Sequence, residues 1–223
     1  MLKRLAIIPA ALGLALAWNE PSIGAGAFGR TDLVDASTAI PALRVDLKYA
    51  TSDNFLHRNV YGDLDRCFLH KEAAGMLAKA DHFLQAEHPK YRLHVFDCAR
   101  PRRVQREMWA IVKGTAQEPY VANPNDKTGS IHNYGGAVDL TIDDAAGKAL
   151  DMGTPFDFFG DLAHIDAEQA LIKRGRLTKV QVANRALLRQ VMMRAGFQPL
   201  AVEWWHFNSA SPNETRRRYR IIE

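Results

Sequence analysis

The sequence predicts an α+β protein, with a small, mainly antiparallel sheet and flanking helices in a single domain. The chain has 223 residues, which is enough for one domain with a substantial core. Helix-like and strand-like segments are mixed along it without the regular alternation of a parallel βαβ sheet. No internal repeat, low-complexity segment or long linker divides the chain.

The first predicted elements are a strand, a loop, a helix and a second strand. Residues 42–50 alternate between apolar and charged side chains, as a half-exposed strand does. Residues 52–65 are expected to form a loop. In residues 71–88 apolar side chains recur at three and four positions, which predicts a helix that ends at Pro89. The apolar run at residues 92–97 predicts the second strand.

The middle of the chain predicts a helix, a long loop and a strand. Residues 102–113 follow Pro101, which favours the first turn of a helix. Residues 118–129 are polar and rich in Asn, Pro and Gly, so they are expected to form a loop. Residues 136–142 are apolar and follow a double glycine, which indicates a buried strand.

The last third predicts one helix and one strand. Residues 151–164 are expected to be irregular, with at most one helical turn. Residues 178–195 have helical periodicity, and Gly196 ends that helix. Residues 201–208 resemble a strand. A cluster of arginines near the C-terminus, Arg216–Arg218 with Arg220, is expected to be solvated.

The first residues are not predicted to belong to the fold. A basic start precedes an apolar run from Leu5 to Ala17, which is shorter than the about 20 residues of a membrane-spanning helix. This pattern is typical of a secretory signal peptide. Two cleavage sites fit, of which the second is preferred: Ala15-Leu16-Ala17 and Ala25-Gly26-Ala27. We therefore expect a signal peptide at residues 1–27, a domain at residues 28–223, and an exported protein, periplasmic or secreted, with no stable membrane span after processing.

Export changes the interpretation of the only two cysteines, Cys67 and Cys98. In a reducing cytosol they would be two buried thiols, whereas in an oxidising compartment they can pair. We predict a disulfide, which in the chain-entropy account would contribute on the order of 3–4 kcal/mol of stability. Two unrelated thiols are the alternative.

The charge pattern does not predict a nucleic-acid partner. The formal net charge is +4, from 29 basic and 25 acidic residues. Nucleic-acid-binding domains concentrate their basic residues in a stripe or patch, often with interleaved aromatic residues. No such stripe is found in this sequence.

The segment SIHNYGGAVDL, residues 130–140, raises the possibility of a metal site. It places His132 and Asp139 on either side of Gly135-Gly136, and the glycines allow both side chains to converge. Catalytic zinc takes three protein ligands from His, Asp, Glu or Cys and leaves one position for water. The third ligand would have to come from elsewhere. A turn that leads into a strand with a surface aspartate would explain the same residues.

A second motif, AVEWWHFN, places Glu203 three residues before His206. A carboxylate so close to a metal ligand can take the proton of the attacking water. Glu203 could equally be an ordinary strand residue. In a regular strand residues 203 and 206 point to opposite faces, so we expect a bulge at Trp204-Trp205 or the end of the strand there. One tryptophan is expected in the core and the other at the wall of the site.

Arg100 lies at the end of a predicted strand and before Pro101, which restricts its direction. Amide hydrolysis builds negative charge on the carbonyl oxygen, and a fixed guanidinium group can stabilise that charge. The alternative is that Arg100 pairs with a structural carboxylate.

Taken together, these motifs resemble the D-alanyl-D-alanine dipeptidase family, the VanX type of zinc peptidase. SIHNYGGAVDL matches its S-x-H-x-x-G-x-A-x-D pattern and EWWHF its E-x-W-H-F pattern. DLKYATSDNF with VYG, FDCARP, and DMGTPFDFF with His164 also resemble the family in the same order. The resemblance spans Val45 to Phe207. One departure is Ala99, where the family often has an aromatic residue, and it leaves the exact substrate open.

The resemblance implies one zinc ion per chain, held by His132, Asp139 and His206. It also implies Glu203 as general base and Arg100 as oxyanion stabiliser.

Two further residues match positions at which the family contacts its substrate. The resemblance implies that Ser130 touches the substrate and that Asp157 receives its free amine. The alternatives are that Ser130 ties down the loop and that Asp157 caps a helix.

The expected function is zinc-dependent hydrolysis of the small D,D-dipeptide D-Ala-D-Ala in cell-wall peptide turnover. A D,D- or L,D-carboxypeptidase that trims peptidoglycan peptides is the alternative. A non-catalytic zinc module is a third possibility, and a base beside a ligand argues against it. The oligomeric state is not predicted.

Overall fold

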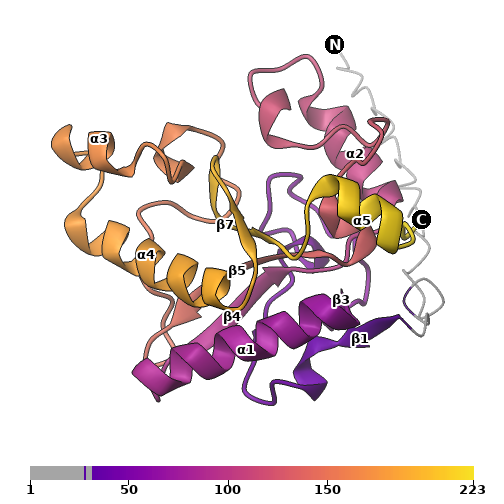
Figure 1. Ribbon diagram of the computed structural model, residues 1–223. Coiled ribbons are helices and arrows are strands. Elements are labelled where there is room, and N and C mark those ends of the chain that lie inside the picture. The colour runs from indigo at the N-terminus through magenta and orange to yellow at the C-terminus, as the bar shows by residue number, and fades with distance from the viewer. Residues whose placement is uncertain (1–27, 29–31) are drawn as a thin grey trace, which may run out of the picture.

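A computed structural model of the chain describes residue 28 and residues 32–223, and it has the α+β architecture that the sequence predicts (Figure 1). The predicted signal peptide lies outside the described residues. The main sheet has five strands in the order β2-β4-β5-β7-β6, and only β2 and β4 are parallel. Its strands are β2 (Arg44–Val45), β4 (Arg92–Asp97), β5 (Ala137–Asp143), β6 (Gln198–Leu200) and β7 (Glu203–Asn208). A second, antiparallel pair consists of β1 (Leu33–Asp35) and β3 (Phe68–His70).

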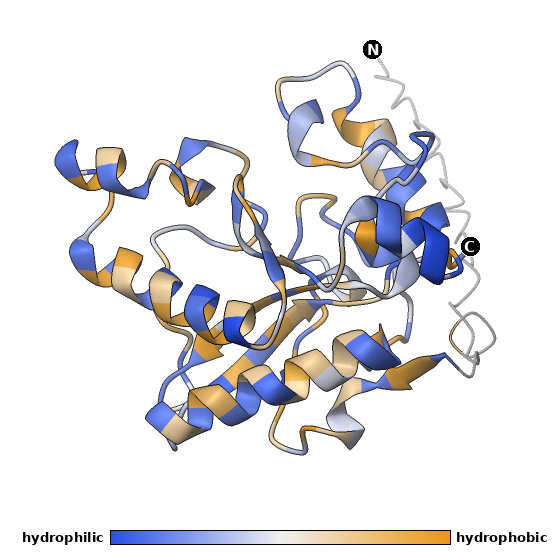
Figure 2. Cartoon of the chain, viewed as in Figure 1, coloured by the Kyte–Doolittle hydropathy of each residue, from blue (hydrophilic) through white to orange (hydrophobic). Residues whose placement is uncertain are grey.

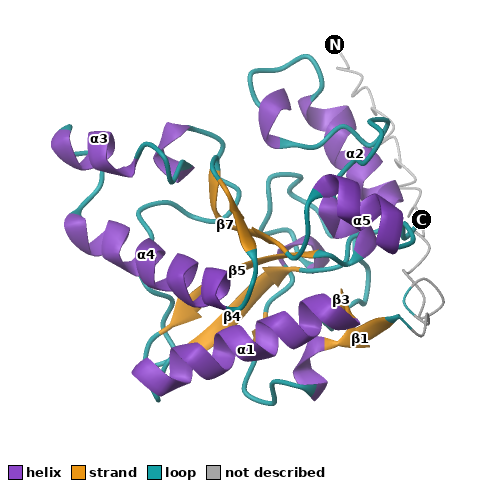
Figure 3. Ribbon diagram, viewed as in Figure 1, coloured by secondary structure: helices purple, strands orange, loops and turns teal. Residues whose placement is uncertain are grey.

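The described part of the chain contains five α-helices, of which α1 and α4 lie along the sheet (Figure 3). They are α1 (Lys71–Glu87), α2 (Arg102–Val112), α3 (Glu168–Lys173), α4 (Lys179–Arg194) and α5 (Pro212–Arg218). Helices α1 and α4 pack against each other and along the sheet, α1 on β4 and α4 on β6 and β7. Among the described residues, none of the helices combines the length and apolar character required to cross a bilayer.

The core lies between these helices and the sheet. Hydrophobic residues concentrate in the central strands, whereas α5 is strongly hydrophilic (Figure 2). Helix α1 buries Leu77 and Leu84, which the helical repeat places on one face. Each fully buried leucine contributes roughly 2 kcal/mol of transfer free energy. The packed helices therefore fix the sheet, and the opposite side of the sheet is free to carry polar side chains.

The predicted strand at residues 42–50 is much shorter than expected. Only Arg44–Val45 is a strand, and a short 3-10 helix at Lys48–Ala50 follows it. The chain turns there because the amides of Val60 and Tyr61 both donate to the carbonyl of Tyr49. Alternation of side chains continues through this turn, which is why the pattern alone suggested a longer strand.

The arginine-rich segment is helical rather than an extended tail. Helix α5 begins at a capping box in which Ser211 and Glu214 exchange side-chain and backbone hydrogen bonds. It packs against the 3-10 helix Ile131–Tyr134. Arg217 and Arg218 are exposed, as expected for solvated side chains. The last helix therefore supports the turn that contains His132.

Two irregularities in strand register shape the functional side of the sheet. Between β4 and β5, Val95 pairs with Leu140 but Asp97 pairs with Asp139, so Phe96 is an extra residue on β4. Between β6 and β7 the register shifts at the two tryptophans, which confirms the irregularity predicted there. Register shifts of this kind redirect side chains next to active sites.

The predicted disulfide between Cys67 and Cys98 is present, with a Cα–Cα distance of 5.4 Å. It joins the residue before β3 to the residue after β4. The amide of Ala99 also donates to the carbonyl of Phe68 at 2.9 Å. The end of β4 is thus fixed to the two-stranded sheet both covalently and by a backbone hydrogen bond.

Candidate metal centre

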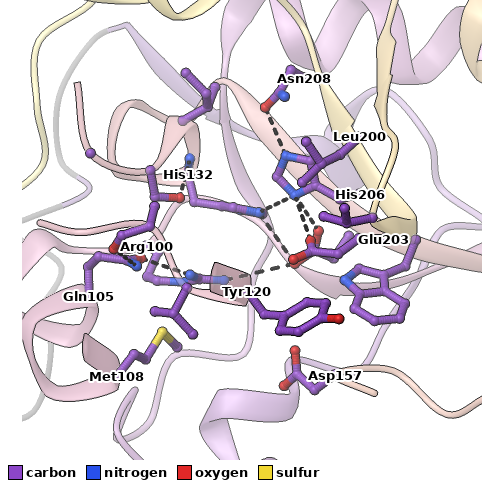
Figure 4. A pocket seen from close by; sticks show the side chains of 18 of the residues that line it. Arg100, Gln105, Met108, Tyr120, His132, Asp157, Leu200, Glu203, His206 and Asn208 are labelled. Atoms are coloured by element: carbon purple, nitrogen blue, oxygen red, sulfur yellow. Dashed lines mark hydrogen bonds and ion pairs between the residues drawn. The ribbon is translucent and has the colours of Figure 1, made fainter. Parts of the chain in front are cut away.

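Three side chains predicted as metal ligands meet in one buried cluster (Figure 4). His132 lies in the 3-10 helix Ile131–Tyr134, Asp139 on β5 and His206 on β7. Asp139 and His206 are direct partners in the antiparallel register, which brings their side chains to the same point. One ligand atom from each residue lies within 4.8 Å of the others.

The candidate ligand atoms of the three residues lie close enough together to bind a single ion between them. His206 Nδ1 lies 2.9 Å from Asp139 Oδ1 and 3.2 Å from His132 Nε2. His132 Nε2 lies 3.3 Å from Asp139 Oδ2. Burial alone would raise the pKa of Asp139, but the two neighbouring imidazoles lower it well below its ordinary value. Two imidazole nitrogens and a carboxylate oxygen form a donor set that suits zinc.

Each imidazole ring is oriented by a partner outside the cluster. His132 Nδ1 lies 2.7 Å from the carbonyl oxygen of Cys98, and His206 Nε2 lies 2.9 Å from Asn208 Oδ1. If each of these nitrogens donates a proton, the lone pairs of His132 Nε2 and His206 Nδ1 face the centre. Such partners fix the tautomer and the ring orientation of metal-binding histidines.

The turn that positions His132 depends on a serine and a glycine. Ser130 Oγ accepts from the amide of His132 at 3.3 Å and so begins the 3-10 helix. Gly135 ends that helix with φ of 68°. A Cβ at this position would lie 2.7 Å from Leu33 Cδ2 and 3.0 Å from the backbone nitrogen of His70, so only glycine fits. Ser130 therefore ties down the loop, and it also lines the cavity described next.

A cavity of about 310 Å³ opens onto the cluster, and Glu203 lines it. Glu203 Oε2 lies 3.8 Å from His206 Nδ1, and the side chain is 13% exposed. Burial raises the pKa of Glu203 to about 8, and the nearby carboxylates of Asp139 and Asp157 also raise it. A carboxyl group with a pKa near neutrality beside a ligand has the properties of a general base.

The two tryptophans between Glu203 and His206 divide their roles as predicted. Trp205 lines the cavity and contacts Phe156, with ring centroids 5.5 Å apart. Trp204 does not line the cavity; its Nε1 donates to Thr154 Oγ1 at 2.7 Å, and it packs in the core.

Arg100 lines the cavity and is also paired with a structural carboxylate. Its Nε and Nη2 both donate to Asp97 Oδ2, at 2.9 and 2.5 Å, and its Nη1 donates to Gln105 Oε1 at 2.9 Å. Of its five N–H groups these bonds use three, which leaves two for other partners. Its Nη2 is 3.9 Å from Asp139 Oδ2, so the guanidinium group lies beside the metal cluster.

Sequence reasoning missed the residues that hold Arg100. Asp97 is fully buried and accepts from the hydroxyl of Tyr61 at 2.6 Å as well as from Arg100. Tyr49 lies under the guanidinium carbon of Arg100, which is 5.1 Å from the ring centroid. The one available signal was Asp97 itself, a charged residue at the end of an apolar strand.

Asp157 lines the same cavity from the side opposite His132 (Figure 4). It begins no helix; its backbone has φ of 58°, and its Oδ2 accepts from the hydroxyl of Tyr49 at 2.8 Å. Burial raises the pKa of Asp157 to about 8, and the carboxylates of Asp139 and Asp97 also raise it. Asp157 is therefore placed as a cavity residue and not as a helix cap.

A set of three converging ligand atoms with a buried carboxyl group at their side defines a metallopeptidase type of site. The D-ala-D-ala dipeptidase family, peptidase family M15, matches residues 29–220, and the chain belongs to this family.

Named relatives cover most of the chain. The D-alanyl-D-alanine dipeptidase of Escherichia coli (strain K12) is 34% identical over 177 residues, which are 79% of this chain and 84% of that protein. The D-alanyl-D-alanine dipeptidase of Enterococcus faecium is 30% identical over 184 residues, 75% of this chain and 86% of that protein. The protein of the same name from Streptomyces coelicolor is 28% identical over 191 residues, 79% and 90% of the two chains.

Proposed function

We propose that the protein is a zinc-dependent dipeptidase that hydrolyses D-Ala-D-Ala. The observation that carries the proposal is the buried His132–Asp139–His206 cluster, which shares one cavity with Glu203. Membership of the family, and the names of the relatives, support the dipeptide as substrate. A base beside the ligands argues against a module that only binds zinc.

His132 Nε2, an oxygen of Asp139 and His206 Nδ1 would hold one zinc ion. When bound, zinc supplies a Lewis acid that polarises a carbonyl group and lowers the pKa of water. Glu203 takes the proton of the attacking water and delivers it to the leaving amine, because it is the carboxyl group next to the ligands.

Arg100 is the proposed stabiliser of the developing oxyanion. Asp97 and Gln105 hold its guanidinium group in place, so the two remaining N–H groups would need little reorganisation to meet the substrate carbonyl. A fixed donor of this kind contributes roughly 3–4 kcal/mol to transition-state stabilisation in a dry site.

Asp157 and Ser130 are the proposed substrate contacts. Asp157 lies across the cavity from the metal cluster and would accept the free amine of the dipeptide, while Ser130 lines the same space. The cavity of about 310 Å³ is at the small end of ligand sites, which favours a dipeptide over a bulky ligand. A carboxypeptidase acting on longer peptides is the alternative, and a free-amine contact at Asp157 would favour the dipeptidase.

Export is part of the proposal. The signal-like pattern in residues 1–27 and the Cys67–Cys98 disulfide both suit an oxidising compartment outside the cytoplasm. In that setting residues 28–223 would form the mature zinc dipeptidase domain and would meet dipeptides released from the cell wall.

One experiment tests the metal and the base together. Metal-loaded protein is incubated with D-Ala-D-Ala and with a wall pentapeptide, and bound zinc is measured in parallel. We expect one zinc per chain, with loss of the ion in His132→Ala, Asp139→Ala and His206→Ala. Glu203→Gln should keep zinc but lose turnover by a factor of about 10²–10⁴.

Asp63→Asn, at an exposed carboxylate outside the cavity, is the control and should match the wild type. Full zinc occupancy in all three ligand variants would contradict the metal assignment. Near-normal turnover in Glu203→Gln would mean that another group carries the proton.

A further inference from the structure

The loop at residues 118–129 forms one wall of the catalytic cavity. Its Tyr120 and Ala122 line the cavity, and Tyr120 faces the same space as Asp157 (Figure 4). The loop contains no strand, and its one regular element is the 3-10 turn Glu118–Tyr120. No ladder of backbone hydrogen bonds to a neighbouring strand holds it, so side chains of other segments must keep this wall in place.

His164 holds Tyr120 from outside the cavity. Its Nε2 lies 3.2 Å from the hydroxyl oxygen of Tyr120, although His164 itself does not line the cavity. The amide of His164 donates to the carbonyl of Asp161 at 3.1 Å. The amide of the next residue, Ile165, donates to the carbonyl of Ala201 at 2.8 Å. The backbone that carries the imidazole ring is thus fixed on both sides of the contact with Tyr120.

The ring of Tyr120 packs on the segment that carries Asp157. It stacks on Phe159, with ring centroids 5.5 Å apart and an interplanar angle of 14°. Phe159 follows Asp157 by two residues and also lines the cavity. Stacking fixes the separation of two ring planes, but offset arrangements of similar energy leave sliding within the plane almost free. The directional bond between the Tyr120 hydroxyl and His164 therefore supplies the constraint that stacking lacks.

A second anchor holds the loop two residues further along. Gln105 Nε2 donates to the carbonyl of Ala122 at 2.8 Å, while its Oε1 accepts from Arg100 Nη1 at 2.9 Å. Gln105 is only 1% exposed. The Ala122 end of the loop is therefore tied to the arginine side of the cavity, and Tyr120 is tied to the Asp157 side. Loss of the Tyr120 contact should disturb the Asp157 side first.

We propose that His164 is a positioning residue of the dipeptide site, which acts through the Tyr120 hydroxyl to hold the cavity wall opposite the substrate amine at Asp157. The inference rests on the proposed function, because that function assigns the amine to Asp157. It also gives a role to His164, which belongs to one of the sequence motifs but takes no part in the proposed reaction. The wall contacts the amine end of the substrate, where no bond changes. It should therefore contribute equally to the binding of substrate and transition state, and its loss should raise KM without lowering kcat.

The test measures kcat and KM for D-Ala-D-Ala in zinc-loaded Tyr120→Phe, which loses only the hydroxyl, and in His164→Ala. Each variant should raise KM by about fivefold, the factor that corresponds to one neutral hydrogen bond, and leave kcat within about twofold. The double variant should be no worse than either single one, because both changes remove the same contact. His164→Gln, whose side-chain amide can bond the same hydroxyl, should keep KM within about twofold of wild type.

Tyr91→Phe is the matched control. Tyr91 stacks on His88 with ring centroids 4.8 Å apart, and it does not line the catalytic cavity, so its KM should equal that of the wild type. Bound zinc is measured in every variant and should not change. An unchanged KM in both Tyr120→Phe and His164→Ala overturns the inference. Losses that multiply in the double variant also overturn it, because the two side chains would then act independently.

A binding measurement separates this inference from the proposed function. In the Glu203→Gln background, calorimetry gives the dissociation constant of D-Ala-D-Ala without turnover. Adding Tyr120→Phe should raise that constant by about fivefold. Such a rise, in a protein whose wild type does not hydrolyse the dipeptide, would retain the positioning role and reject the proposed function. An unchanged constant, with normal turnover by the wild type, would reject the positioning role alone.

Discussion

Reduction of the Cys67–Cys98 disulfide is expected to weaken the fold and the metal centre together. The bridge closes a loop of 31 positions. The chain-entropy relation for a loop of that length gives about 3.7 kcal/mol of lost stability at 25 °C. For a domain of this size that loss corresponds to a fall in Tm of roughly 10 °C.

The effect on the metal centre follows from a backbone contact. The carbonyl of Cys98 accepts from His132 Nδ1 at 2.7 Å, so loosening residue 98 loosens the ring orientation of a proposed ligand. Loss of such a partner typically lowers metal affinity by about 10–100-fold. The amide of Ala99 still donates to Phe68 after reduction, which should keep the strand end close to its place.

Urea unfolding of metal-free protein, with and without a phosphine reductant, measures the effect of the disulfide on the free energy of unfolding without any contribution from zinc. Competition with a chromophoric chelator then measures zinc affinity in both redox states. The Cys67→Ala/Cys98→Ala double variant should behave like the reduced protein and not respond to reductant. A stability loss below about 1 kcal/mol would refute the entropy argument, and unchanged zinc affinity would refute the coupling through the Cys98 carbonyl.

Three other predictions concern residues outside the reaction. Gly135→Ala should lower the free energy of unfolding by about 1–3 kcal/mol in urea titrations, because residue 135 has a positive φ and the new Cβ meets Leu33 and a backbone atom. The control Gly147→Ala, also at positive φ but in open space, should lower it by only about 1 kcal/mol. Equal losses in the two variants would contradict the steric explanation. Arg185→Met should cost about 2–4 kcal/mol, since the buried carbonyl of Met152 and the partly buried carbonyl of Leu162 lose the donors that Arg185 Nε and Nη2 supply at 2.7 and 2.8 Å; a thermal shift below about 2 °C would argue against this. Burial lowers the pKa of His94, so the unfolded chain binds that proton more readily and stability is lost as pH falls below about 6.5. The difference in free energy of unfolding between the wild type and His94→Asn should therefore shrink as the pH is lowered from about 7.5 to about 5.5. A difference that does not change with pH would contradict the lowered pKa of His94.

The long helices could be predicted from the sequence because their signals are local. The expected helix at residues 178–195 is observed at Lys179–Arg194, and its start is a capping box that Thr178 and Gln181 form within four residues. The strands β1, β3 and β6 have three residues each. At that length no periodicity can be read, and pairing with another segment creates the strand, distant in sequence for β1 and β3 and adjacent for β6.

In the candidate site, the ligands could be predicted from the sequence but the residues that hold them in place could not. The ligand set His132, Asp139 and His206 was implied by the resemblance of two motifs to the family, and the structure brings all three side chains together. The partners that orient the rings could not be predicted, because a backbone carbonyl such as that of Cys98 has no sequence signature. The role of Asp97 depends on contacts with Tyr61 and Arg100, which only the folded chain reveals.

The two imidazoles of the cluster face it through different nitrogens, and this has a spectroscopic consequence. His132 turns Nε2 inward while its Nδ1 meets the Cys98 carbonyl, whereas His206 turns Nδ1 inward while its Nε2 meets Asn208. In ¹⁵N magnetic resonance the rings would show opposite tautomers, with the protonated nitrogen at Nδ1 in His132 and at Nε2 in His206. Each ring would thus report separately on its own side of the cluster, so that one isotope-labelled sample could show which ligand first responds when the ion is added.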